Sequence, residues 1–351
     1  MKKNIALFGF AIAVMVLFGA ANGFAVRLFR GDKTINLSQI PSPVFNKMTP
    51  AGVLLGKQLF SDTRLSGNNS LSCKSCHRPE FAFSDTARFS LGVSSKHVGR
   101  NAMSLSNLAW QPFYMWDGRV QQLEEVIILP ITNPDEMAAD TAEVLLNMNA
   151  DNHYRKLSKE AFQTDTLYFR HIAYAISQYL RTLVSANTEM EQQIAAFKDS
   201  KTPDNAALVK KMMPFASDKV VAITFTCLAC HTHDLMFGGL IMKNNGIDSV
   251  SNNQGLIVST KDPNDEGVFK VPTLKNIAFT APYMHDGRFK TLEEVVEHYD
   301  SGIQAHPNLS QELKDTSGGP LRLNLSQKEK KQMVRFLEMF TDTAFISANK
   351  E

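Results

Sequence analysis

Every cysteine of the chain belongs to one of two Cys-x-x-Cys-His motifs. Two thiols three residues apart on one helical turn can each form a thioether with the same porphyrin, and the histidine that follows then faces the iron. A redox dithiol or half of a zinc site is the alternative for Cys-x-x-Cys alone, but the histidine directly after each motif argues against both. We therefore expect two covalently bound c-type haems. Their attachment and proximal residues are Cys73, Cys76, His77, Cys227, Cys230 and His231.

The first 25 residues have the layout of a secretory signal peptide, because Lys2 and Lys3 precede an apolar run over residues 5–21. An uncleaved membrane anchor is the alternative, since the run is only slightly shorter than the roughly 20 residues that a membrane span needs. Export to the periplasm agrees with haem attachment to thiols, which takes place in an oxidising compartment. The formal net charge of +2 over 351 residues gives no sign of a nucleic-acid partner.

A block of sequence repeats 169 residues further along the chain. Residues 104–126 and 273–295 share Asn-x-Ala, then Tyr-Met-x-Asp-Gly-Arg, then Leu-Glu-Glu-Val. The two haem motifs are themselves 154 residues apart. This duplication predicts two tandem cytochrome c-like domains, which we place at residues 26–202 and 203–351.

Helical patterns dominate the chain. Apolar spacing predicts helices over residues 51–60, 139–157, 167–183, 204–215 and 327–339. Thr291 with Glu294 and Ser326 with Glu329 are capping boxes that start two helices, the first of which we expect to run to Tyr299. Long loops are expected over residues 61–70, 244–267 and 300–324. Because period-two alternation is scarce, the fold class is predicted to be mainly α with few short strands.

These motifs resemble the bacterial di-haem cytochrome c peroxidase and MauG family over about residues 48–340. The resemblance is carried by residues 59–66, by Trp-Asp-Gly-Arg at 116–119, by Asn-Pro-Asp-Glu-Met at 133–137 and by residues 271–287. In that family the N-terminal haem meets hydrogen peroxide, and the six-coordinate C-terminal haem stores or relays electrons. The resemblance therefore implies a peroxidatic first domain and an electron-transfer second domain.

The resemblance also implies roles for single residues. Trp116 matches the tryptophan between the haems, with ordinary core filling as the alternative. Glu136 matches the distal acid, whose carboxylate would move a proton between the two oxygens of peroxide; a solvated glutamate is the alternative. His285 is implied to lie near a propionate of the second haem. A calcium ion is implied as well, and its oxygen ligands match Asn101, Thr280 and Pro282.

The axial position of the second haem departs from the peroxidases proper. They carry a methionine fourteen residues after the histidine that matches His285, whereas this chain has Tyr299, as MauG-like members do. A phenolate oxygen stabilises ferric iron and should lower the potential of that haem. His298 is a rival ligand, but on a helix it points about 100° away from Tyr299. A tyrosine with a solvated hydroxyl is the remaining alternative.

Two positions around the first haem also depart from the family. Val93 stands where reductively activated peroxidases have a removable histidine ligand, so we expect a site open to peroxide, with His97 as an alternative resting ligand. Val126 replaces a distal glutamine, which weakens the assignment to the peroxidases.

The leading hypothesis is a peroxidase that reduces hydrogen peroxide with electrons from a small cytochrome c or a cupredoxin. A MauG-like oxidase that modifies a partner protein or organic substrate, and a non-catalytic di-haem electron carrier, are the alternatives. Family members often form dimers, so a homodimer is possible on that resemblance.

Overall fold

A computed structural model of the chain describes residues 37–197, 205–231, 239–251 and 253–349. The predicted signal peptide and the predicted domain boundary at residues 202 and 203 lie outside these residues. Within them, no helix combines the length and the apolar character that crossing a membrane would require.

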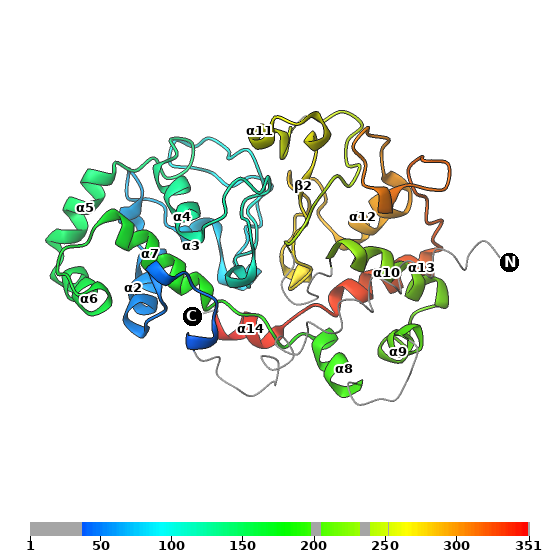
Figure 1. Cartoon of the computed structure of the whole chain (residues 1–351), viewed down its shortest axis with the longest axis horizontal. Coiled ribbons are helices and arrows are strands. Elements are labelled where there is room, and N and C mark those ends of the chain that lie inside the picture. Colours follow the sequence, from blue (N-terminus) through cyan, green and yellow to red (C-terminus); the bar gives the residue numbers. More distant parts are fainter. Residues whose placement is uncertain (1–36, 198–204, 232–238, 252, 350–351) are drawn as a thin grey trace.

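The structure is mainly helical, as predicted, and it has two lobes that lie side by side (Figure 1). The helices are α2 (Pro50–Phe60), α3 (Cys73–Cys76), α4 (Leu123–Thr132), α5 (Thr141–Ala150), α6 (Asn152–Phe162), α7 (Phe169–Arg181), α8 (Glu189–Phe197), α9 (Asn205–Met212), α10 (Asp218–His231), α11 (Ile257–Thr260), α12 (Leu292–Glu297), α13 (Gln327–Glu338) and α14 (Thr343–Ala348). In the part of the chain that the structure describes, the one sheet pairs β1 (Met242–Lys243) antiparallel with β2 (Phe269–Lys270).

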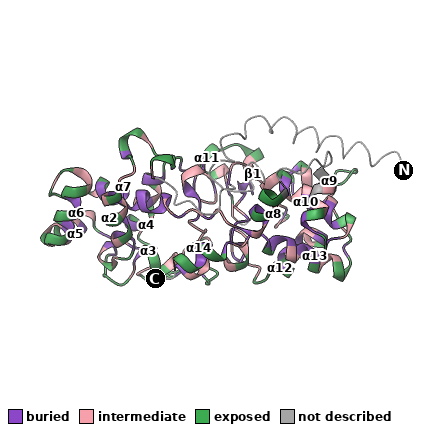
Figure 2. Ribbon diagram, turned by 90° about the horizontal axis from the view of Figure 1, so that it is seen from below, coloured by how far each residue is buried: buried purple, intermediate pink, exposed green. Residues whose placement is uncertain are grey.

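The first lobe is built on the packing of α2 against α7. Its core includes Leu55, Leu59 and Phe60 from α2 and Ile172 and Ile176 from α7, which lie on one face of each helix. The two helices approach closely at Gly56, where a Cβ would lie only 1.9 Å from the backbone oxygen of Ala175. Figure 2 shows the buried residues inside both lobes and the exposed residues outside.

The second lobe packs α10, α12 and α13 around a separate core. Val220 and Val221 of α10, Val295 of α12 and Phe336 of α13 are all buried in it. The two predicted capping boxes are confirmed. Oγ1 of Thr291 accepts the backbone N–H of Glu294 at the start of α12, and Ser326 does the same for Glu329 at the start of α13.

One helix of each lobe lies just beyond a segment that crosses between the lobes. Phe345 and Ile346 of α14, near the C-terminus, are buried in the core of the first lobe, and Met190 of α8 is buried in the core of the second. The segments that lead to these helices cross between the lobes. There the Asp342 carboxylate accepts hydrogen bonds from the Ser185 hydroxyl at 3.1 Å and from two backbone N–H groups of the crossing segment at 2.9 Å.

The repeated sequence block has a repeated local structure. Asn107 and Asn276 both adopt the left-handed conformation with φ of 59°. The hydroxyls of Tyr114 and Tyr283 each donate to the carbonyl oxygen of the residue six positions earlier, at 3.1 and 2.9 Å. Tyr114 also forms a β-bridge with Val120, and Tyr283 forms the equivalent β-bridge with Phe289. The repeated sequence therefore folds into the same local turn in both lobes.

Candidate functional site

Both proximal histidines are held by the same kind of hydrogen bond. His77 follows α3, and its Nδ1 lies 2.9 Å from the carbonyl oxygen of Phe83. His231 ends α10, and its Nδ1 lies 2.9 Å from the carbonyl oxygen of Pro272. A carbonyl only accepts, so Nδ1 carries the proton in each ring and Nε2 keeps its lone pair for a metal.

Burial reinforces this arrangement. It lowers the pKa of His77 below its usual range and lowers the pKa of His231 to about 4. Both rings are therefore neutral near pH 7, which is the state that binds iron.

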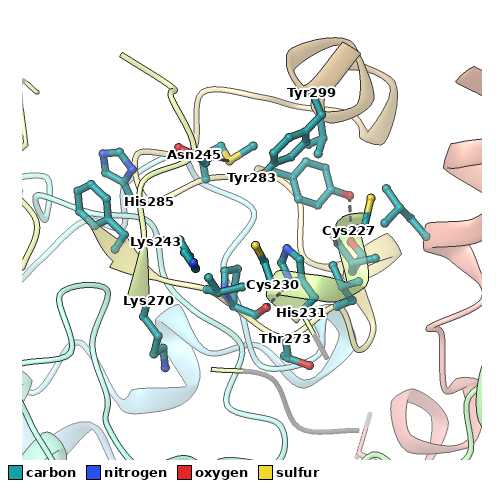
Figure 3. Close-up of a pocket in the computed structure, with 18 of the residues that line it drawn as sticks. Cys227, Cys230, His231, Lys243, Asn245, Lys270, Thr273, Tyr283, His285 and Tyr299 are labelled. Carbon is teal, nitrogen blue, oxygen red and sulfur yellow. Dashed lines mark hydrogen bonds between the residues drawn. The ribbon is translucent and has the colours of Figure 1, made fainter. Parts of the chain in front are cut away.

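A cavity of about 220 Å³ opens beside α10. Cys227, Cys230 and His231 line one side of it, and Tyr299 lies across the cavity from them (Figure 3). The remaining wall is largely aliphatic and includes Val296 and Leu337. Two thiols, an imidazole nitrogen and an opposing phenol around an apolar space fit a covalently attached haem with two axial ligands.

Tyr299 enters this cavity because of the backbone around it. Helix α12 ends at Glu297, and the next five residues, His298–Gly302, form a turn of π-helix. Burial raises the pKa of the Tyr299 phenol to about 12, and a hydrogen bond from the Asn245 side chain opposes that rise. His298 is not on the cavity wall; its Nε2 donates to the carbonyl oxygen of Asn245 at 3.1 Å. The two neighbours thus face different ways, as their helical spacing predicts.

His285 and Trp116 lie on another part of the same cavity wall. The His285 ring stacks on Phe269 with centroids 3.9 Å apart, and Trp116 meets it edge-on with centroids 6.4 Å apart. Burial lowers the pKa of His285 to about 4, so the ring is neutral. Trp116 comes from the first lobe, and its backbone oxygen accepts the N–H of Lys270 from β2 at 2.7 Å. The indole therefore lies where the two lobes meet.

Glu136 lies near the other haem motif. Burial raises the pKa of the Cys76 thiol, and the nearby carboxylates of Asp85 and Glu136 add to that rise. Glu136 is half-buried, and its Oε1 accepts the side-chain N–H of Asn133 at 2.8 Å. Burial raises the pKa of Glu136 above its usual value, while the Asn133 hydrogen bond and the charge of Arg119 oppose the rise. These contacts hold the half-buried carboxylate on the side of the first haem motif.

The three residues singled out around the first haem motif, Val93, His97 and Val126, have different surroundings. The backbone N–H of Val93 donates to the backbone oxygen of Glu136 at 2.8 Å, so an apolar side chain accompanies the acid. His97 is exposed, and its Nδ1 lies 3.1 Å from the carbonyl oxygen of Phe89. Val126 is half-buried against the core of the first lobe.

The three residues at the predicted calcium positions come together on the cavity wall. Asn101, Thr280 and Pro282 all line it. The side-chain nitrogen of Asn101 donates to the carbonyl oxygens of Ala87 at 3.2 Å and Arg88 at 3.3 Å, which turns its oxygen the other way. Among the described residues there is no group of three or more His, Cys, Asp or Glu residues that could hold a metal ion. A calcium site here would therefore consist of amide and carbonyl oxygens, and it stays a prediction.

Three polar residues of the site were not found from the sequence. Asn133 holds Glu136, and Asn245 contacts Tyr299. Lys270 is buried on the cavity wall, where its Nζ donates to Oε1 of Gln111 at 2.7 Å and burial lowers its pKa to about 7. Asn133 opens the Asn-Pro-Asp-Glu-Met motif, so its spacing of three from Glu136 was a usable signal. Nothing in the local sequence distinguishes Asn245 or Lys270 from surface residues.

Comparisons with known proteins agree with this geometry. A profile of the family described as di-haem cytochrome c peroxidase matches residues 50–199. The methylamine utilization protein MauG of Methylorubrum extorquens is 31% identical over 85% of this chain and 80% of its own length. Cytochrome c551 peroxidase of Nitrosomonas europaea is 32% identical over 69% of this chain and 71% of its own. The crystal structure of a MauG-like protein associated with microbial copper homeostasis aligns with a TM-score of 0.75 and 30% identity, over 92% of this chain and 99% of that one.

Such identity over most of both partners shows common descent, and the two haem motifs lie in equivalent surroundings within one duplicated fold. This chain belongs to the di-haem cytochrome c peroxidase and MauG family.

Proposed function

We propose that the protein is a periplasmic peroxidase that reduces hydrogen peroxide to water with electrons from an external donor, a small cytochrome c or a cupredoxin. Each turnover consumes one peroxide, two electrons and two protons and yields two waters. Membership of the family implies two c-type haems, which supply the electron storage and the iron site when bound. The observation that carries the proposal is the half-buried Glu136 carboxylate beside the first haem motif.

Glu136 would move the proton that O–O cleavage requires. A carboxylate within hydrogen-bond reach can take the proton from one peroxide oxygen and return it to the oxygen that leaves as water. Asn133 fixes the position of Oε1, and Val93, whose backbone N–H donates to the backbone oxygen of Glu136, has no side-chain atom that could bind iron. Burial keeps the carboxyl pKa closer to neutrality than that of a solvated glutamate, which favours both halves of the transfer.

Trp116 and Tyr299 would serve the electron side of the reaction. Trp116 lies at the meeting of the lobes with its Nε1 donating to the carbonyl oxygen of Asn101 at 2.8 Å. A backbone carbonyl is not a base, so an indole that loses an electron would keep its proton and could be reduced again without proton transfer. His231 and Tyr299 would hold the iron of the second haem, and an anionic oxygen ligand stabilises ferric iron.

A MauG-like activity on a partner protein is the second candidate. The support for it is the tyrosine at position 299 together with the match to MauG proteins. A tyrosine at position 299 bears on the potential of the second haem, however, and does not determine which reductant is oxidised.

The first experiment mixes peroxide with the purified diferric protein and follows the Soret band by stopped flow. We expect Glu136→Gln to slow the reaction about 10²–10⁴-fold, the usual contribution of a positioned acid-base group. Asp135→Asn is a matched control, because Asp135 is the adjacent carboxylate, is exposed and pairs with Lys96 at 2.9 Å. A wild-type protein that does not react with peroxide in either redox state would leave only the electron-carrier reading.

A second experiment separates the two enzymatic candidates. Peroxide is added with a reduced small c-type cytochrome or a reduced cupredoxin as the donor. Steady oxidation of the donor supports the peroxidase. Rapid reaction with peroxide but no turnover with either donor favours oxidation of a protein or organic substrate.

A further inference from the structure

The wall of the cavity beside α10 carries positive charge. Among the described residues that line it there are three lysines and no aspartate or glutamate. Nζ of Lys243 pairs with Oε1 of Glu312 at 2.7 Å. Lys275 pairs with Glu191. Lys270, the third, forms no ion pair with a carboxylate of the described residues, so its charge is left uncompensated on the cavity wall.

Lys270 is deeply buried where the two lobes meet. It is only 4% exposed, and its backbone N–H donates to the backbone oxygen of Trp116 at 2.7 Å. Its Nζ donates to Oε1 of Gln111, a neutral amide of the first lobe, at 2.7 Å. This bond uses one of the three hydrogens of an ammonium group. Burial lowers the pKa of Lys270 to about 7, and a buried lysine is stable in its charged form only when an anion compensates it. The surroundings of Nζ are therefore suited to a carboxylate.

Lys270 lies on the side of the cavity where a bound haem would present its carboxylates. A Cys-x-x-Cys-His motif forms thioethers at the vinyl groups of the porphyrin, and the propionates lie at the opposite edge. Figure 3 shows Cys227 at one side of the cavity and Lys270 at the other, with His285 on the side of Lys270. Phe269, the neighbour of Lys270 in β2, stacks on the His285 ring. A porphyrin attached to Cys227 would therefore extend its propionates toward Lys270.

We propose that Lys270 is a cofactor-binding residue, whose ammonium group pairs with a propionate carboxylate of the second haem at the meeting of the lobes. The proposal rests on the proposed function in one respect, that this cavity holds the second haem. It does not depend on the reaction with peroxide at the first haem.

This ion pair would also act on the potential of the second haem. A phenolate ligand such as Tyr299 favours ferric iron and lowers the potential. A cation that compensates a propionate charge acts in the opposite direction, because it favours the added electron of ferrous iron. Lys270 would thus keep the second haem reducible by an external donor, and Gln111 would orient its Nζ.

The test measures the midpoint potential of each haem by spectroelectrochemistry in the purified di-haem protein. Lys270→Gln removes the charge and keeps a polar side chain beside Gln111. Charges inside a protein interact through an effective dielectric constant of about 20, so we expect the ferric form of the second haem to gain about tenfold over the ferrous form. This corresponds to a fall of about 59 mV for a one-electron couple. The propionate bending mode in the resonance Raman spectrum should shift as well, because it responds to the groups that bind the carboxylate.

Lys270→Arg tests whether the charge is responsible. A guanidinium group keeps a cation that binds carboxylates, so the potential of the second haem should stay close to that of the wild type. An unchanged potential of the second haem in Lys270→Gln would overturn the proposal. An equal fall in Lys270→Arg would overturn it too, because the loss of charge would then not be the cause.

Two controls separate an ion pair from a merely structural role. Gln111→Leu removes the bond between the lobes but leaves the charge of Lys270. Lys243→Gln combined with Glu312→Gln removes a charged pair from the same region without changing the net charge. We expect neither control to lower the potential of the second haem. A fall in Gln111→Leu as large as that in Lys270→Gln would show that Lys270 only joins the lobes, and it would overturn the proposal.

The same measurements separate this inference from the proposed function. If the wild-type protein does not react with peroxide, the peroxidase proposal falls, while a lowered potential in Lys270→Gln still supports the ion pair. If peroxide is reduced but the potential falls only at the first haem in Lys270→Gln, the assignment of Lys270 to the second haem is refuted and the peroxidase stands.

Discussion

Glu136 has a raised pKa because it is buried, and this sets the acid limit of the proposed reaction. Only the ionised carboxylate can take a proton from peroxide. The second-order rate constant with peroxide should therefore fall as the pH drops through a value above the ordinary 4.5 of a glutamate. A pH profile measured by stopped flow checks this. Glu136→Gln should abolish the acid limb, and a limb that persists in this variant belongs to another group.

Loss of the Asn133 hydrogen bond should shift the acid limb of this pH profile in a defined direction. This hydrogen bond to Oε1 stabilises the carboxylate and lowers the pKa of Glu136. Asn133→Ala removes the bond, so the pKa should rise and the acid limb should shift to higher pH, with the rate at alkaline pH less affected. The same profile measures it. An acid limb displaced to lower pH would show that Asn133 does not act through this bond.

Trp116 is expected to carry electrons between the lobes. In Trp116→Phe, a protein with the second haem reduced should transfer its electron to the first site more slowly after peroxide is added, because phenylalanine is much harder to oxidise than indole. Stopped-flow absorption at wavelengths specific to each haem measures the rate. Trp110→Phe replaces the other tryptophan of the chain and should leave the rate unchanged. Equal rates in all three proteins would remove Trp116 from the path.

Residue chemistry was predictable where spacing along the chain encodes it. The histidine after each Cys-x-x-Cys is held through Nδ1 in both lobes, and Tyr299 reaches the cavity while His298 does not. The roles of these residues as iron ligands, and those of Glu136 and Trp116, stay predictions. Asn245 and Lys270 could not be found, because their contacts depend on loops that meet only after folding.

Helix boundaries were predictable where a side chain caps the backbone. The single helix expected over residues 139–157 is wrong, since Asp151 ends α5 and its side chain accepts the N–H of His153 at the start of α6. The helix expected to run to Tyr299 ends at Glu297 in a π-helical turn, which no periodicity announces. Helix α10 was missed, because apolar residues lie on all its sides and the amphipathic period is weak.

Removing the N-terminal cap of α12 tests how this helix supports the site. Oγ1 of Thr291 accepts the N–H of Glu294 at 3.2 Å, and α12 leads directly to Tyr299. Thr291→Ala should cost about 1 kcal/mol in the free energy of unfolding, measured in urea. Thr132→Ala is the control, because its exposed hydroxyl only donates back to Ile128 within α4, and its effect should be smaller. Equal losses of unfolding free energy in the two variants would mean that the Thr291 cap stabilises the protein no more than the exposed Thr132 hydroxyl does.

Across the whole molecule, two segments cross between the lobes, one before α8 and one before α14. Asn276 lies at the repeat position of Asn107, and both contact the crossing segment at Ser185. Asp342 completes the contact, since its backbone N–H donates to Oδ1 of Asn276 at 2.8 Å and its carboxylate accepts the donors of the crossing segment. The relative position of the two haem motifs therefore depends on buried polar groups and on apolar packing.

Asp342→Ala would leave two buried donors, the Ser185 hydroxyl and the Phe345 N–H, and two half-buried backbone donors without this acceptor. Oδ2 of Asp342 accepts the N–H groups of Ala186 and Asn187, and Oδ1 accepts that of Phe345 at the start of α14. Because unsatisfied buried donors cost about 1–3 kcal/mol each, we expect a loss of about 3 kcal/mol or more in the free energy of unfolding. Hydrogen exchange read by mass spectrometry should show faster exchange at the crossing segment and in α14. Asp315→Ala removes a carboxylate that only caps its own exposed turn, so it should change neither. If the crossing segment stays protected in Asp342→Ala, the Asp342 carboxylate is not needed to hold that segment.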